Sequence, residues 1–211
     1  TFSNIAAYIN KFTDAISLKR FTIYLHDYGS PIGLRLCVNH PEKIEKIIVQ
    51  NGNAYMEGIG PQWDEYIDYW KNPAPEKKAQ LMGFLTEEGV RSQYTAGLPE
   101  ELLPAVSPEL WMLDWERMKR PGNVDMQFEL NCDYADNLRM FPLFQDYFRT
   151  HQPPALIIWG RYDVFFELEE AYCYKRDLPG AQTHVINGGH WALETNFDEV
   201  LMLIDNFLSA K

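Results

Sequence analysis

Three side chains with useful chemistry each follow a hydrophobic run of the sequence. Asp27 comes just after FTIYL, Asp163 just after PALIIWG, and His190 just after THVIN. An ionised carboxylate can attack carbon without first losing a proton, and a histidine oriented by a second carboxylate can activate water. In this chain order the three residues are candidates for nucleophile, orienting acid and base.

The elements that must position these residues read as an α/β pattern. Short runs rich in β-branched and aromatic residues indicate buried strands at 21–25, 46–50, 154–160 and 183–187. Helical spacing is expected at 4 to about 17 with Ser3 as N-cap, at 31–40, at 169–175 and after 196. A strand, helix, strand succession predicts a parallel sheet, and ligands of such sheets bind beyond the carboxyl ends of the strands.

The middle of the chain lacks a buried-strand pattern. Tryptophan, tyrosine and proline accumulate between about 51 and 151, in segments such as PQWDEYIDYWKNP and SPELWMLDWERM. We therefore expect residues 1–53 and 151–211 to form the α/β core and residues 54–150 to form an inserted helical cap.

The segment around Asp27 is suited to a sharp strand-to-helix turn. The order nucleophile, acid, histidine is that of α/β-hydrolases, whose nucleophile usually lies in G-x-S-x-G. Ser30 does not fit this motif, because Tyr28 and Ile32 stand two places to either side of it. Asp27 fits better, since Gly29 stands two places after it as the motif requires. Leu25, two places before it, replaces the usual small residue.

Several motifs together resemble the epoxide hydrolase and haloalkane dehalogenase branch of the α/β-hydrolases. They are HDYGSPIG, HPEKIEKIIVQNGNAY, PPALIIWGRYD and GGHWALET, and they span essentially the whole chain. The resemblance implies that Asp27 is the nucleophile, Asp163 the triad acid and His190 the base. It also implies that the backbone N–H of Tyr28 is one oxyanion donor and that the insertion is the cap domain.

The same resemblance implies a two-step hydrolysis. Asp27 would form an alkyl ester, which water activated by His190 would then hydrolyse. Cap tyrosines would protonate the departing epoxide oxygen, with Tyr134 at the place of the later one and Tyr94 a candidate for the earlier one. Haloalkane dehalogenases usually have Trp after the nucleophile, and Tyr28 at that position favours an epoxide.

Each assignment has a simpler alternative. Asp27 alone could be the N-cap of the next helix, and Asp163 alone a turn residue. Tyr134 and Tyr94 could serve only in packing. His26 is expected under the sheet, because neighbours on a strand point to opposite faces. For the whole chain, the alternatives are a haloalkane dehalogenase or another ester-type hydrolase, and a non-catalytic binding protein or inactive fragment of this fold.

Composition limits the partners of the chain. The 211 residues are 46% hydrophobic and carry a net charge of −11, which argues against nucleic-acid and anionic-membrane partners and favours a small, apolar to moderately polar organic substrate. No apolar run is long enough to span a membrane. Three separated cysteines suggest neither a disulfide framework nor a zinc site, so we expect a cytoplasmic protein without metal or cofactor.

The beginning of the sequence leads to one more expectation. The chain starts without Met, and the HGxP-like loop implied by the resemblance does not occur in it. The strand ending at Asp27 would then be a free, apolar sheet edge, open to a missing N-terminal segment or to self-association. We therefore expect the chain to be the carboxyl-terminal part of a hydrolase.

Overall fold

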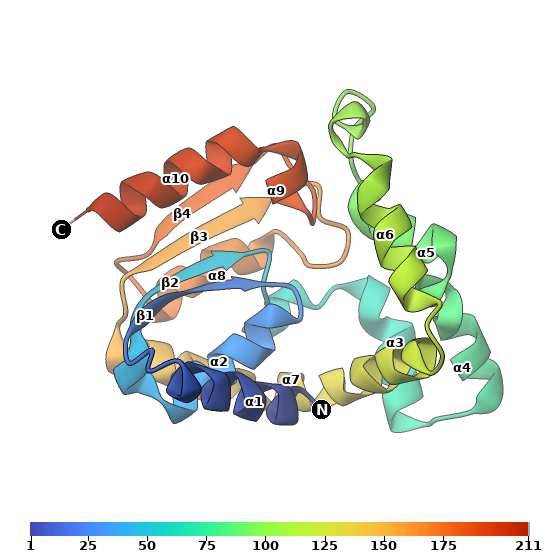
Figure 1. Cartoon of the computed structure of the whole chain (residues 1–211), viewed down its shortest axis with the longest axis horizontal. Helices are drawn as coiled ribbons and strands as arrows, with labels where there is room; N and C mark the ends of the chain where they lie inside the picture. The colour runs from blue at the N-terminus through green and yellow to red at the C-terminus, as the bar shows by residue number, and fades with distance from the viewer. Residues whose placement is uncertain (211) are drawn as a thin grey trace.

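The centre of the molecule is an open parallel sheet. The computed structural model describes residues 1–210 and contains four strands in the order in which they occur in the chain (Figure 1). They are β1 (Phe21–His26), β2 (Ile44–Gln50), β3 (Ala155–Gly160) and β4 (Gln182–Ile186). All neighbouring pairs are parallel, with Tyr24 opposite Ile48 and Ile48 opposite Leu156. The predicted α/β class and the four predicted strands are confirmed.

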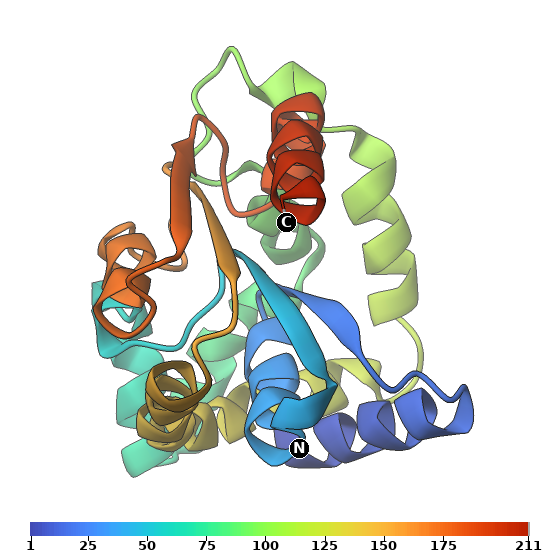
Figure 2. The same cartoon turned by 90° about the vertical axis from the view of Figure 1, so that its left-hand side faces the viewer.

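Helices cover both faces of this sheet. The helices packed around it are α1 (Phe2–Ala15), α2 (Gly29–Asn39), α8 (Glu169–Asp177), α9 (Ala192–Thr195) and α10 (Phe197–Ser209). Figure 2 shows α10 and α8 on opposite sides of the strands. Short 3-10 turns occur at η1 (Pro41–Lys43), η2 (Met56–Gly58), η3 (Pro61–Trp63), η4 (Met82–Leu85) and η5 (Leu103–Ala105).

The alternation of side chains along the central strands divides the core into two parts. Ile47 and Val49 belong to the larger cluster, which also contains aromatic residues of α7 and α8. Ile48, between them in the sequence, belongs to the smaller cluster under α10. Because successive side chains of a strand point to opposite faces, a strand buried on both faces must be apolar throughout, as ALIIWG of β3 is.

A group of helices lies beyond the carboxyl ends of the strands. Its members are α3 (Asp64–Lys71), α4 (Pro75–Leu81), α5 (Glu87–Thr95), α6 (Pro108–Met118) and the start of α7 (Asn123–His151) (Figure 1). α3, α4, α6 and the start of α7 share a small apolar cluster, built on Leu81, Leu85 and Phe128. All of these helices lie between β2 and β3 in the chain, and their assignment to a separate cap domain stays a prediction.

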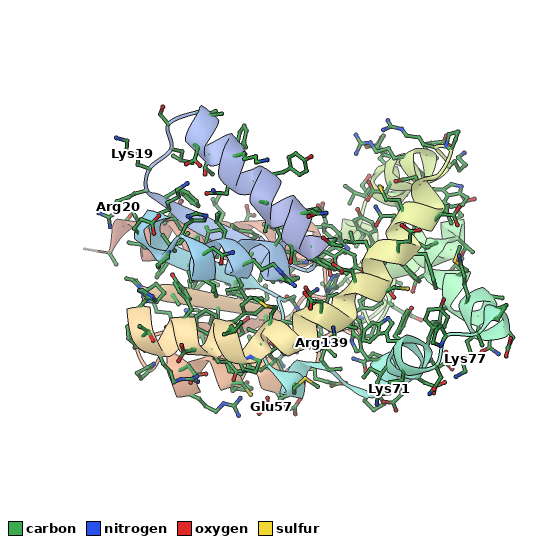
Figure 3. All side chains as sticks on the ribbon, turned by 90° about the horizontal axis from the view of Figure 1, so that it is seen from below. Lys19, Arg20, Glu57, Lys71, Lys77 and Arg139 are labelled. Atoms are coloured by element: carbon green, nitrogen blue, oxygen red, sulfur yellow. The ribbon has the colours of Figure 1, made fainter. Side chains whose placement is uncertain are left out.

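The long helix α7 connects this group with the core. Its early residue Phe128 packs in the cluster of the cap helices, whereas Phe141, Phe144 and Phe148 are buried in the main core. Figure 3 shows α7 running from the cap helices along α2, with Arg139 on its outer side. The division at residues 54 and 150 stays a prediction, and the packing leads us to propose that the change from cap to core occurs within α7.

The first helix differs from its prediction in two ways. It begins at Phe2, with Thr1 rather than Ser3 as the N-cap, because the Thr1 hydroxyl accepts the backbone N–H of Asn4. Its apolar side chains are in part uncovered by the rest of the protein, since Phe12 is 58% and Ile16 53% exposed. Within the described residues β1 pairs only with β2, so its other edge is free. Self-association at this edge stays a prediction.

No helix of the described residues combines the length and the apolar composition that a membrane crossing requires.

Candidate active site

Asp27 lies on a sharp turn between β1 and α2. Its φ is +47°, a left-handed conformation that is uncommon for a residue with a side chain and that persists where the surroundings enforce it. Its N–H donates to the carbonyl of Asn51 at 3.2 Å, and its carbonyl accepts the N–H of Ser30 at 2.9 Å. No side-chain cap bond is found at the start of α2. The carboxylate is therefore not used to cap the helix and faces the adjoining cavity.

The structure brings the three predicted catalytic residues together. His190 Nδ1 lies 2.9 Å from Asp163 Oδ2, and His190 Nε2 lies 3.9 Å from Asp27 Oδ1. A carboxylate can only accept, so Nδ1 carries the proton of that hydrogen bond. The second nitrogen, directed at Asp27, is then free to accept a proton from water. His190 and Asp163 are almost entirely buried, whereas the Asp27 side chain is partly accessible.

Two opposing effects set the pKa of His190. Burial alone would lower this pKa, because it disfavours the charged ring. The negative charge of Asp163, its hydrogen bond and the charge of Asp27 act in the opposite direction and raise the pKa above its ordinary value. The two carboxylates therefore make this buried imidazole a stronger base.

Asp163 is itself fixed from several directions. Its Oδ1 accepts the backbone N–H groups of Phe165 at 2.8 Å and Phe166 at 3.2 Å. Its Oδ2, which faces His190, also accepts the Asn51 amide at 2.8 Å. Asn51 is buried at a φ of +43°. Asn51 was not predicted as a site residue, and the structure shows that it helps to orient Asp163.

A second set of contacts holds the backbone of the histidine loop. The His190 carbonyl lies 3.0 Å from His26 Nε2 and accepts the Gln50 amide at 3.3 Å. Burial and the proximity of His190 lower the pKa of His26 to about 4, so its ring is neutral and Nε2 donates to the carbonyl. His26 was expected under the sheet, and the structure places it against the histidine loop, with its ring 4.7 Å from that of Trp191. Its ring lies 4.9 Å from that of His190, because the loop after β4 folds over the end of β1.

A cavity of about 1070 Å³ opens over Asp27 and His190. Trp63, Tyr66 and Phe84 from the cap side and Phe165 and Phe166 from the loop after β3 give it aromatic walls. Tyr28, directly after Asp27, also lines it, and its hydroxyl accepts the Asn131 amide at 3.3 Å. A carboxylate and an imidazole at one end of an apolar cavity suit an organic substrate.

The two cap tyrosines predicted from the sequence do not line this cavity. Tyr94 donates its hydroxyl to Asp114 at 2.6 Å and stacks on Trp191. Tyr134 is fully buried, stacks on Trp63 and accepts the Asn53 amide at 2.9 Å. Its ring lies 5.7 Å from that of Tyr28, so it belongs to the layer behind the cavity wall.

Tyr66 is the cap tyrosine that does line the cavity. Its hydroxyl makes no hydrogen bond within residues 1–210. Tyr66 follows Trp63 and precedes Trp70 at helical spacing, a pattern that also fits plain core packing, so the sequence carried no signal that singled it out. In the part of the chain that the structure describes, no three His, Cys, Asp or Glu side chains converge as metal ligands.

The fold and this site define the class of the protein. Residues 1–197 match the family model described as alpha/beta hydrolase fold, and the chain belongs to that family. Its relatives include the uncharacterized hydrolase YNR064C of Saccharomyces cerevisiae, 34% identical over 93% of this chain and 68% of the relative. In seven curated relatives the match spans between 62% and 72% of the relative's own length.

Solved structures show the same fold at low sequence identity. A mutant of haloalkane dehalogenase DatA from Agrobacterium tumefaciens C58 is 16% identical, with a TM-score of 0.73 over 100% of this chain and 74% of that one. Epoxide hydrolase VrEH1 from Vigna radiata is 19% identical, with a TM-score of 0.67 over 99% of this chain and 75% of that one.

Proposed function

We propose that the protein is a hydrolase that acts through a covalent ester on Asp27, most like an epoxide hydrolase. The observation that carries the proposal is the left-handed turn that presents the Asp27 carboxylate to the cavity, opposite His190 and Asp163. A carboxylate used for capping or for an ion pair with Lys or Arg would not need this geometry.

The first step is attack by Asp27 on an sp3 carbon of the substrate. A carboxylate oxygen forms the C–O bond of an ester, while the C–O bond of the epoxide breaks and its oxygen takes a proton. Tyr66 is the better candidate for the proton donor, because it lines the same cavity as Asp27. Tyr134 stays a second candidate through its proximity to Tyr28, whereas the hydroxyl of Tyr94 is engaged by Asp114.

The second step is hydrolysis of the ester. Water gives a proton to His190 Nε2 and attacks the carbonyl carbon of the Asp27 ester, and collapse of the tetrahedral intermediate releases the diol and restores the carboxylate. The backbone N–H of Tyr28 at the start of α2 is the proposed oxyanion donor, since the first N–H groups of a helix lack partners within the helix.

Haloalkane dehalogenation is the second candidate, favoured by the likeness to DatA. A departing halide needs N–H or O–H donors in the cavity. Among the lining residues, the Trp63 indole N–H already donates to the Phe165 carbonyl at 2.8 Å. A donor committed in this way is not free for an anion, so Trp63 does not supply a halide site in this cavity.

Mass measurement on a His190→Gln variant of the full gene product tests the covalent step. Incubation with a panel of epoxides and haloalkanes should add one substrate-derived group to Asp27, because attack does not need His190. We expect hydrolysis of this ester to slow by about 10²- to 10⁴-fold. Asp27→Asn is the matched control and should acquire no adduct. Absence of an adduct across the panel would favour the alternative of a non-catalytic binding protein.

A further inference from the structure

Glu170 is a buried carboxyl group without a cationic partner. It lies in the first turn of α8 and is 0% exposed. Its Oε1 accepts the backbone N–H groups of Ala54 at 2.5 Å and Tyr55 at 2.9 Å, in the segment that joins β2 to the cap. Its Oε2 has no hydrogen-bond partner within residues 1–210. An ionised carboxylate in this position would leave one charged oxygen unpaired in the interior.

A second orphaned oxygen lies next to Glu170. The Asn53 amide nitrogen donates to the Tyr134 hydroxyl at 2.9 Å, while Asn53 Oδ1, also buried, has no partner among the described residues. The two oxygens without partners both lie next to Gly58. A Cβ added to Gly58 would be 1.5 Å from Glu170 Oε2 and 2.9 Å from Asn53 Oδ1. Two acceptors brought this close are both satisfied if one of them carries a proton.

We propose that Glu170 is a protonated positioning residue whose O–H donates to Asn53 Oδ1 and thereby sets the direction of a hydrogen-bond chain that ends at Tyr134. With its oxygen accepting from Glu170, Asn53 must present its nitrogen to Tyr134. The Tyr134 oxygen then accepts, and its own proton is left for another acceptor.

The opposite charge state would reverse this chain. An ionised Glu170 would draw the amide nitrogen of Asn53 toward itself, and the amide oxygen would then face Tyr134. In that arrangement the Tyr134 O–H would donate its hydrogen bond to the amide oxygen of Asn53. The protonation of one buried carboxyl group therefore decides whether Tyr134 can donate elsewhere.

The surroundings of Glu170 favour the protonated form. Burial raises its pKa well above the ordinary value, the two backbone hydrogen bonds oppose this effect, and the charges of Glu57 and Asp163 add to it. Its titratable neighbours carry no positive charge; they are Glu57, Asp163, Tyr55, Tyr134, Tyr174 and Cys173. Arg176, on the same helix, pairs with Glu57, which Figure 3 shows at the outer surface.

The chain leads toward the candidate nucleophile. Burial raises the pKa of Tyr134 well above its ordinary value, and the charge of Asp27 adds to this effect. This last link rests on the proposed function, in which a tyrosine near Asp27 protonates the departing oxygen. The protonation of Glu170 and its bond to Asn53 do not depend on that function.

Chemical unfolding of the wild type and of Glu170→Gln between about pH 5 and 8 tests the proposal. Glutamine keeps both hydrogen bonds, with its carbonyl toward Ala54 and Tyr55 and its amide toward Asn53, but does not titrate. Unfolded Glu170 ionises in this range while folded Glu170 keeps its proton. The unfolding equilibrium constant of the wild type, relative to the variant, should therefore rise about tenfold per pH unit. A ratio that does not change with pH would overturn the proposal.

Infrared spectroscopy supplies a second test that needs no unfolding. At pH 7 the wild type should show the C=O band of a protonated carboxyl group that Glu170→Gln lacks, and Asn53→Ala should shift this band by removing its acceptor. Glu57→Gln, at the surface, is the control and should leave the band in place. If Glu170 contributes only the bands of an ionised carboxylate, the proposal is refuted. The unfolding and infrared results can both be interpreted even if no epoxide alkylates Asp27.

Discussion

At the scale of single residues, the site depends on side chains that hold other side chains in place. Asp163 orients His190, but Asn51 and two backbone N–H groups hold Asp163. His26 and Gln50 hold the backbone of His190. The sequence predicted the three reacting residues from their order after strands. It did not predict Asn51 or His26, because an amide or a second histidine beside a strand end carries no spacing signal of its own.

A test at this scale concerns His26, whose pKa is lowered to about 4 in the folded protein by burial, with the charge of His190 adding to the effect. The unfolded chain takes up a proton near pH 6.5, its ordinary value, while the folded chain does not. Stability due to His26 is therefore present above this pH and is lost as pH falls toward 4. We expect His26→Gln, which keeps an N–H donor, to lose less stability than the wild type in denaturant unfolding between pH 7 and 4. Equal losses in the two proteins would contradict the neutral, donating ring.

At the scale of elements, the ends of the parallel strands bring distant segments together. β1, β2 and β3 end beside one another, which is why residues far apart in the sequence meet at one rim. Short apolar runs bounded by turn residues made these strands predictable. The cap helices were predicted as a group, but their packing was not, because long-range contacts decide which aromatic residues face the cavity. Tyr94 and Tyr134, which the sequence predicted as substrate-binding candidates, therefore lie outside the cavity wall.

Gly160 provides the test at this scale. It is the last residue of β3, and an added Cβ would lie 2.1 Å from the carbonyl oxygen of Gly189 and 2.7 Å from that of Gly188, both in the loop that carries His190. Backbone atoms cannot move aside as the tip of a side chain can. We expect Gly160→Ala to lower the free energy of unfolding by about 1–3 kcal/mol and to slow hydrolysis of the Asp27 ester by moving His190.

The matched control is Gly180→Ala, since an added Cβ at Gly180 meets nothing within 4 Å. Unfolding by denaturant and single-turnover kinetics would compare the two variants. Equal behaviour of Gly160→Ala and Gly180→Ala would show that the loop does not depend on this close approach.

At the scale of the whole molecule, the sheet and the cap together make the cavity. The carboxylate and imidazole come from the ends of strands, whereas much of the apolar wall comes from the cap helices, and the start of α7 adds the polar side chains Asn123, Gln127 and Asn131. The fold class followed from periodicity, and the proposed chemistry came from three residue types in order together with the family resemblance. The shape of the cavity did not follow, because it depends on how α7 passes from the cap cluster to the main core.

Isotope tracing during catalysis tests the central claim, a covalent ester on Asp27, most directly. The full gene product is given excess epoxide in water enriched in ¹⁸O, and the peptide containing Asp27 is then weighed. If water attacks the ester carbonyl, ¹⁸O enters the Asp27 carboxylate, and the diol of the first turnover carries the unlabelled oxygen that Asp27 had supplied. Diol labelled from the first turnover, with Asp27 unlabelled, would contradict the account, because water would then have attacked the substrate directly.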